Sequence, residues 1–122
     1  IIMPLLIKLR CYIKDGRRED FVENQEKLCN VMENNYPGIS IYHCDYPEGT
    51  NICDFLEVYN DDSAFQEHLQ HKEGQVYLNA VVGASEKLEC KVYGKPNEES
   101  KTILDGFAAT YHESAKNSVI RR

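Results

Sequence analysis

The sequence predicts a single α+β domain with the ferredoxin-like element order β-α-β-β-α-β, in which helices cover one face of an antiparallel sheet. Three observations support this fold class. Four segments alternate apolar and polar residues as strands do, longer segments repeat apolar residues at helical spacing, and glycine, proline or asparagine residues separate them. The chain of 122 residues is also the size of one domain. We expect residues 1–94 to form this domain and residues 95–122 to form a C-terminal helix and tail.

The first strand is expected over residues 5–13 and the first helix over residues 17–34. Alternate positions of the strand are apolar, which predicts one well-buried face. Asp15, in the turn that follows, is a candidate N-cap for the helix. The helix is expected to end before Pro37, because proline cannot continue it. Its apolar residues at helical spacing are Phe21, Leu28, Cys29 and Met32.

The second and third strands are expected over residues 39–45 and 52–59, joined by a loop that contains Pro47 and Gly49. Both sides of the third strand carry large residues. One side has Ile52, Asp54, Leu56 and Val58, and the other has Cys53, Phe55, Glu57 and Tyr59. We therefore expect both faces of this strand to be covered.

The second half of the chain is expected to continue with a helix over residues 63–72, because polar residues suited to an N-cap precede it. Gly74 is expected to interrupt this helix, and a second helical piece follows over residues 75–82. The fourth strand is expected over residues 88–93. A terminal helix and a tail that a partner could order are expected over residues 98–107 and 108–122.

The sheet face that points away from the helices is expected to be apolar. In this interpretation it carries Leu6, Tyr12, Tyr42, Phe55 and Tyr59. An apolar patch of this size is unfavourable on a monomer in water. A second subunit packed face to face would cover it, so the sequence predicts a homodimer.

Charge and hydropathy narrow the classes of protein to consider. The net charge is −6 and the pI is about 5.2, and no basic patch of the kind that binds nucleic acid is present. No apolar run approaches the roughly 20 residues of a membrane span. We therefore expect neither nucleic acid nor membrane as a partner.

The five cysteines are scattered, with one in most of the expected elements and no Cys-x-x-Cys motif. Buried free thiols in the reducing cytoplasm are the simplest interpretation. A bridge between Cys44 and Cys53 across the second hairpin is an alternative that their spacing allows.

Several motifs together resemble the antibiotic biosynthesis monooxygenase family of dimeric α/β barrels. They are the Lys14-Asp15-Gly16 turn followed by Phe21, the Tyr36-Pro37-Gly38 segment followed by Tyr42, the third strand Phe55-Leu56-Glu57-Val58-Tyr59, and a helix with Asp61, Ser63, Phe65 and His68. The resemblance extends over residues 5–93. Each motif is short, and it is their order and spacing that carry the resemblance. The family often has tryptophan in the third strand, whereas this chain has no tryptophan.

The resemblance implies a homodimer with a pocket between the sheet and the helices of each subunit. It also implies that the chain is a cofactor-independent monooxygenase acting on a small aromatic or quinol-type molecule, with neither metal nor flavin. Such chemistry requires a base for a phenolic proton and hydrogen-bond donors for the resulting anion. The candidate catalytic residues are His68 as the base, with Tyr59 and Tyr42. The candidate substrate-binding residues are Arg10, Tyr77, Phe55 and His71.

Glu57 is expected to have a structural role. A carboxylate between Phe55 and Tyr59 on one strand face needs a partner if it is buried. Lys8 or Arg10 on the neighbouring strand could supply it, either within a subunit or across the dimer.

Two other functions are compatible with the same residues. One is a non-catalytic dimer that binds a small apolar ligand or serves assembly. The other is a protein that binds or degrades haem through a histidine of the second helix. A pocket with His68 and inward tyrosine hydroxyls would favour the oxygenase. A pocket filled by side chains would favour the non-catalytic dimer, and a flat slot open to a histidine nitrogen would favour the haem protein.

Overall fold

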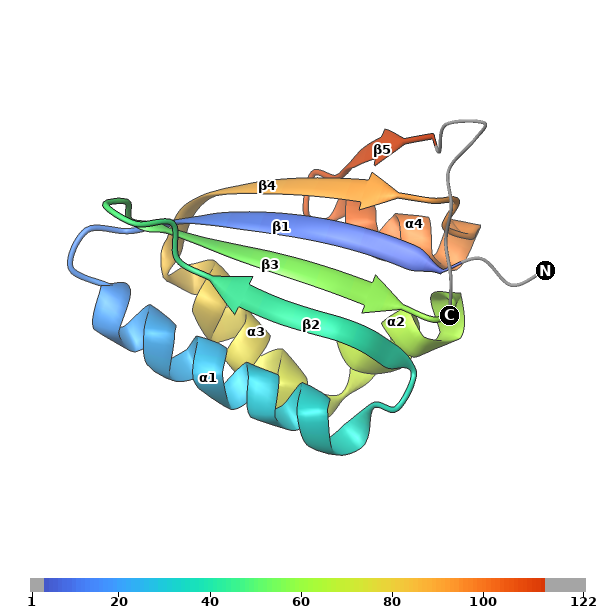
Figure 1. Cartoon of the computed structure of the whole chain (residues 1–122), viewed down its shortest axis with the longest axis horizontal. Helices are drawn as coiled ribbons and strands as arrows, with labels where there is room; N and C mark the ends of the chain where they lie inside the picture. Colours follow the sequence, from blue (N-terminus) through green and yellow to red (C-terminus); the bar gives the residue numbers. More distant parts are fainter. Residues whose placement is uncertain (1–3, 114–122) are drawn as a thin grey trace.

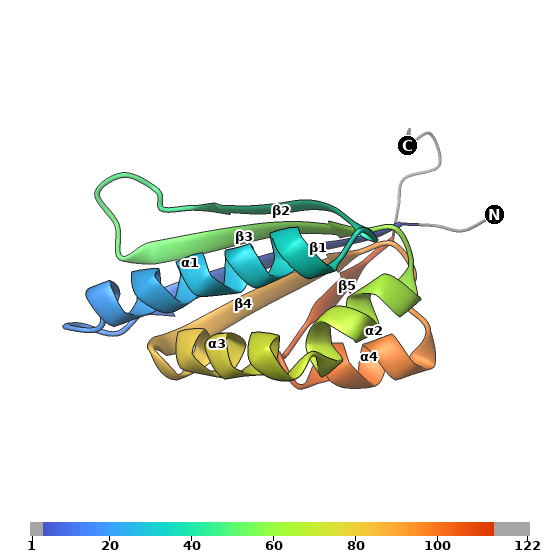
Figure 2. The ribbon, with the colours of Figure 1, turned by 90° about the horizontal axis from the view of Figure 1, so that it is seen from below.

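The computed structural model describes residues 4–113 of the chain, arranged as one sheet covered by helices. The strands are β1 (Leu5–Ile13), β2 (Ile39–Asp45), β3 (Ile52–Tyr59), β4 (Ser85–Tyr93) and β5 (Thr110–His112). The helices are α1 (Arg18–Asn35), α2 (Asp62–Gln70), α3 (Lys72–Gly83) and α4 (Glu98–Asp105). These four helices all lie on one side of the sheet (Figure 2). The predicted ferredoxin-like α+β fold is therefore confirmed.

The strand order in the sheet is β2-β3-β1-β4-β5, with β1 at the centre (Figure 1). β1 pairs antiparallel with both β3 and β4, as the ferredoxin-like arrangement requires. β5 was not expected from the sequence. It lies in the predicted tail over residues 108–122 and pairs parallel with the end of β4. The rest of that tail, from residue 114, lies outside the described residues.

The side of β3 that faces the helices differs from the prediction. Phe55 and Tyr59 are only 2% and 0% exposed, and Tyr59 packs edge-on against Phe65 of α2. Tyr42 of β2 lies on the same side, because its ring contacts His68 of α2. Placing Tyr42, Phe55 and Tyr59 on the open face was therefore wrong. The strand register explains this, since the buried face of β1 aligns with Cys53, Phe55, Glu57 and Tyr59.

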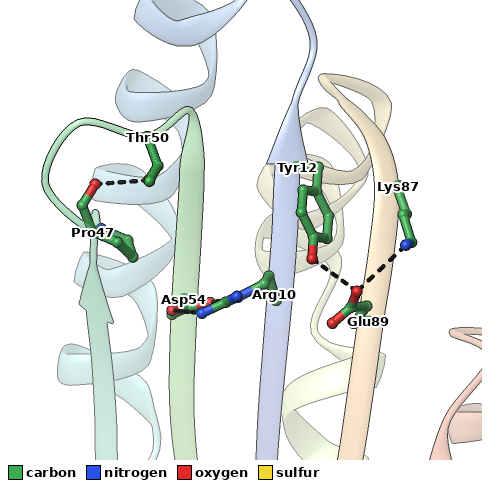
Figure 3. A network of polar contacts seen from close by, with 7 residues as sticks. All are labelled: Arg10, Tyr12, Pro47, Thr50, Asp54, Lys87 and Glu89. Atoms are coloured by element: carbon green, nitrogen blue, oxygen red, sulfur yellow. Dashed lines mark hydrogen bonds and ion pairs between the residues drawn. The ribbon is translucent and has the colours of Figure 1, made fainter.

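The open face of the sheet is polar at one end and apolar at the other. At the polar end the Arg10 guanidinium donates two hydrogen bonds to Asp54 of β3, at 2.8 and 2.9 Å. On the other side of β1, the Tyr12 hydroxyl donates to Glu89, which also pairs with Lys87 (Figure 3). The neighbouring hairpin is closed by the Thr50 hydroxyl, which donates to the Pro47 carbonyl oxygen (Figure 3).

The apolar end of this face comes from cross-strand neighbours of three strands. Leu6 of β1 is paired with Val58 of β3 and with Tyr93 of β4, and Ile41 of β2 is paired with Val58. Ile41 is 44% exposed. Of the residues predicted on the open face, Leu6 and Tyr12 do lie there.

Helix boundaries are fixed by caps that differ in part from the expected ones. Asp15 does not cap α1, whose N-cap is Arg17 without a side-chain hydrogen bond. Asp61 caps α2 as expected, because its carboxylate accepts the Ala64 N–H at 2.9 Å. The break between α2 and α3 lies at His71, and Gly74 is inside α3, so the predicted interruption at Gly74 was wrong.

The five cysteines are all free thiols, and the alternative bridge between Cys44 and Cys53 is absent. Cys11, Cys53 and Cys90 are buried as predicted, whereas Cys29 and Cys44 are only half-buried. Within residues 4–113, none of the helices has the length and apolar character required to cross a bilayer.

Candidate functional site

A small cavity lies between the sheet and helices α2, α3 and α4. Its volume of about 30 Å³ is enough for one or two water molecules. Four of its lining residues carry functional groups, namely Tyr42, Glu57, His68 and Cys90. The others are apolar, namely Ile7, Leu9, Phe55, Phe65, Leu69, Leu78, Leu104 and Phe107.

His68 is the buried imidazole of this site. The Asp61 cap starts α2 directly after β3, and Phe65 and His68, about one turn apart, both turn toward the sheet. The His68 ring is 3% exposed and stacks on Tyr59 with a centroid distance of 5.8 Å, while Tyr42 meets it edge-on at 5.5 Å. Among the described residues no group hydrogen-bonds to its Nδ1 atom, which is fully buried. His68 therefore contributes a buried imidazole to the cavity wall, and one of its nitrogen atoms has no hydrogen-bond partner within residues 4–113.

The environment of His68 keeps its imidazole neutral. Burial, and to a smaller extent the neighbouring His71, lower the pKa of His68 from 6.5 to about 4. A neutral imidazole has one nitrogen that accepts and one that donates a hydrogen bond. His68 is thus suited to hydrogen bonding near neutral pH, but it is a weak base toward a phenol.

Glu57 is the acidic group of the same cavity. Its side chain faces the helices and is 6% exposed, and its Oε1 atom accepts a hydrogen bond from the Tyr59 hydroxyl. Burial raises the pKa of Glu57 to about 7, although the Tyr59 hydrogen bond acts in the opposite direction. The predicted pairing of Glu57 with Lys8 or Arg10 was wrong, because those residues lie on the opposite face of the sheet.

The two tyrosines beside Glu57 retain their protons. Burial, followed by the nearby Glu57 carboxylate, raises the pKa of both Tyr42 and Tyr59 well above the ordinary value. The Tyr59 hydroxyl is committed to Glu57, whereas the Tyr42 side chain lines the cavity directly. Phe55 forms part of the wall and meets Tyr42 edge-on at 6.1 Å.

Three of the residues predicted to bind substrate lie away from this cavity. Arg10 is on the open face of the sheet, paired with Asp54. His71 caps α3, because its Nδ1 atom accepts the Gly74 N–H at 3.2 Å. Tyr77 lies over the surface between α1 and α3, with its hydroxyl 3.5 Å from Glu73. The structure thus brings together His68, Tyr59, Tyr42, Phe55 and Glu57, and it separates Arg10, His71 and Tyr77 from them.

The sequence did not identify the apolar side chains that close the cavity from the helix side. Leu69, Leu78 and Phe107 are partly buried and line it where it meets the surface. A helix was expected over residues 98–107, which include Leu104 and Phe107, but periodicity alone could not place that helix beside α2.

Neither a metal ion nor haem has a site among the residues that line the cavity. Within the described part of the chain, no group of three or more His, Cys, Asp or Glu side chains is arranged to hold a metal ion. Haem does not fit the cavity, because the sites of molecules of that size have volumes of several hundred Å³ or more.

Comparisons with known proteins give matches of structure only. No protein-family model matches the sequence, and no curated protein sequence is significantly similar to it. A candidate antibiotic biosynthesis monooxygenase from Caulobacter crescentus is 13% identical, with a TM-score of 0.67 over 73% of this chain and 86% of its own. A candidate monooxygenase from Lactobacillus acidophilus is 20% identical, with a TM-score of 0.65 over 71% of this chain and 42% of its own.

A third similar structure is Rv0793 from Mycobacterium tuberculosis. It is 14% identical, with a TM-score of 0.69 over 79% of this chain and 98% of its own. At these identities the likeness concerns the fold. The chain has the ferredoxin-like fold found in structures described as candidate antibiotic biosynthesis monooxygenases, as the resemblance in the sequence predicted.

Proposed function

We propose that this chain is a cofactor-independent monooxygenase that oxidises a small aromatic molecule of the quinol or anthrone type. One observation carries the proposal, namely that Glu57, whose carboxyl group has a pKa of about 7, and His68, whose buried Nδ1 atom has no hydrogen-bond partner among the described residues, line the same apolar cavity. Perturbed titratable groups that converge on one cavity are typical of catalytic sites. The fold shared with candidate monooxygenases is consistent with it.

In this proposal Glu57, rather than His68, accepts the phenolic proton. A base is most effective when its pKa lies near the working pH, and the pKa of Glu57 meets this condition better than that of His68. His68 Nδ1 accepts a hydrogen bond from the substrate, and the protonated Tyr42 hydroxyl donates to the anion that forms. The electron-rich anion then reacts with O₂ at its reactive carbon, and the O–O bond breaks. One oxygen atom becomes a carbonyl oxygen of the product, and the other leaves as water with the two hydrogens that the substrate loses, so that the substrate supplies all four electrons.

The substrate must enlarge the cavity to enter it. The free volume of the cavity is about 30 Å³, which is too small for an aromatic ring. Leu69, Leu78 and Phe107 are the partly exposed side chains at the cavity, so rotation of these groups is the expected route. The same small volume favours the second candidate function, a non-catalytic dimer, because a cavity already filled by side chains needs no substrate.

Oxygen consumption distinguishes the two functions. We expect the metal-free protein to consume O₂ with at least one member of a panel of quinols and anthrones, and ¹⁸O₂ to label the product. Glu57→Gln is expected to lower the rate at least 100-fold, since a general base contributes about 10²–10⁴-fold. The exposed Glu48→Gln is the matched control and should retain the wild-type rate.

Uptake that Glu57→Gln leaves unchanged would show that Glu57 is not the base. Absence of uptake across the panel, with a protein that is folded and dimeric, would replace the oxygenase with the non-catalytic dimer.

We also propose that the chain forms a homodimer through the open face of the sheet. Support comes from the apolar end of that face, where Leu6, Val58 and Ile41 are neighbours on three strands. Sedimentation should give twice the mass of the chain for the wild type. Val58→Asp is expected to shift the mass to that of a monomer, because it buries a charge in the interface. Val76→Asp, at a 63% exposed position of α3, should remain a dimer. A monomeric wild type would contradict the proposal.

A further inference from the structure

Two cysteines from different elements meet outside the cavity. Cys29 lies on α1 and Cys44 on β2, and their Sγ atoms are 3.4 Å apart. The closed bond of a disulfide is about 2.05 Å long, so the two sulfur atoms need to approach by only about 1.4 Å. They are separated by 15 positions in the sequence.

A buried amide sets the roles of the two sulfur atoms. Gln25, 8% exposed, receives a hydrogen bond from the Tyr46 hydroxyl at its Oε1 atom, which directs its Nε2 atom toward Cys29 Sγ at 3.1 Å. Cys29 therefore accepts a hydrogen bond from Gln25, and Cys44 is placed to donate a second one. These contacts favour a thiolate at Cys29, whose pKa falls to about 7, with the Cys44 hydrogen bond as the largest cause.

The paired thiols differ from the other three in access. Cys29 lines a surface hollow of about 350 Å³ together with Glu33, Tyr36 and Tyr42, and both Cys29 and Cys44 are half-buried. In contrast, the remaining three thiols are buried in the core, and burial raises the pKa of each to about 12. They are Cys11, Cys53 and Cys90. Cys29 therefore combines access from the surface with a lowered pKa, which are the two properties that favour reaction with a small oxidant.

We propose that Cys29 and Cys44 form a peroxide-sensitive dithiol that closes reversibly to a disulfide. The Cys29 thiolate attacks one oxygen of hydrogen peroxide, the O–O bond breaks, and the released hydroxide takes a proton to leave as water. The Cys44 sulfur then attacks the sulfur of the resulting sulfenic acid, and the S–O bond breaks as the S–S bond forms. The hydroxide that leaves takes the Cys44 proton and becomes a second water. The two thiols lose two electrons, and the peroxide gains them.

Closure of this disulfide would join α1 to the outer strand of the sheet. Tyr42, two residues before Cys44 on β2, lines both the hollow at Cys29 and the cavity with Glu57. The bond would therefore fix one wall of that cavity. The proposal itself rests on the two sulfur atoms and does not depend on the proposed oxygenase activity.

Peptide mapping provides a direct test, because cleavage after glutamate places every cysteine in a separate peptide. Cys29 falls in residues 27–33, Cys44 in residues 34–48 and Cys53 in residues 49–57. After treatment with a small excess of hydrogen peroxide and blocking of free thiols, we expect the 27–33 and 34–48 peptides to be linked. The linkage should disappear on addition of dithiothreitol.

Two variants test the order of the steps. In Cys44→Ser the reaction should stop at a Cys29 sulfenic acid that dimedone traps, and in Cys29→Ser residue 44 should stay a free thiol. A second measurement uses the wild-type protein alone and compares the rates at which its cysteines are alkylated. Cys29 should react at least 10-fold faster than Cys11, Cys53 or Cys90. The oxidised protein should melt about 5–10 °C above the reduced one, because the cross-link restricts the unfolded chain.

The proposal would be overturned by a disulfide that does not join the 27–33 and 34–48 peptides. It would also be overturned if Cys29 and Cys44 both still react with the thiol-blocking reagent after peroxide treatment. Equal alkylation rates for all five cysteines would overturn the assignment of Cys29 as the reactive thiol.

Discussion

Replacement of Glu57 by glutamine is expected to raise the free energy of unfolding at pH 8 by about 3 kcal/mol. Burial raises the pKa of this carboxyl from its ordinary 4.5 to about 7. Between these two values the folded chain keeps a proton that the unfolded chain has released, so stability falls as the pH rises. Above pH 7 the folded protein contains a buried carboxylate, whereas glutamine retains an oxygen for the Tyr59 hydroxyl without the charge.

Urea unfolding at a series of pH values from 4 to 8 measures this effect. The difference between Glu57→Gln and wild type should grow through the window from pH 4.5 to 7 and remain constant above it. Glu48→Gln, at an exposed position, should follow the wild-type curve. A Glu57→Gln variant with a constant deficit in stability at every pH would mean that the carboxyl is not protonated in the folded protein.

Replacement of His68 by leucine is expected to change the pH dependence of the free energy of unfolding by a similar amount, but in the opposite direction. The pKa of His68 falls from 6.5 to about 4, mainly through burial and to a smaller extent through His71. Between these values the unfolded chain binds a proton that the folded chain does not, so stability rises with pH by about 3 kcal/mol. His68→Leu should lose this rise. Leucine has a similar volume and leaves no unpartnered Nδ1 atom in the core.

The same unfolding series measures this second prediction, and the double variant is its control. In the wild type the opposite slopes of Glu57 and His68 overlap between pH 4.5 and 6.5 and should largely cancel. Each single variant should therefore show a steeper dependence than the wild type, and the double variant should be nearly flat. A wild-type slope that His68→Leu leaves unaltered would show that this imidazole is not neutral in the folded state.

The strands could be predicted from sequence because their periodicity is local, but the buried face of β3 could not. Both of its sides carry large residues, and each side includes one acid, Asp54 or Glu57. The choice depends on pairing with β1, where Arg10 meets Asp54 and Ile7 meets Glu57. Pairing is set by tertiary packing, so an apparently symmetrical strand gives no local signal for it.

Only part of the candidate site could be predicted, because the rest of it also depends on tertiary packing. His68 was identified through the order of short motifs, and Tyr42 and Tyr59 with it. Helix α4 and strand β5 depend on contacts between distant segments, so the sequence could not place Phe107 at the cavity. A turn with Ala108 at a φ of 54° precedes β5, and alanine gives no sequence signal for that conformation.

The strand order has a consequence for how the sheet can grow. On one side the sheet ends in the three residues of β5, which leave little backbone for another strand to pair with. On the other side it ends in the seven residues of β2, whose outer N–H and C=O groups have no neighbouring strand within residues 4–113. Addition of a further strand is therefore directional and favours β2. On this strand the exposed polar side chains of His43 and Asp45 follow Ile41 and oppose unselective pairing.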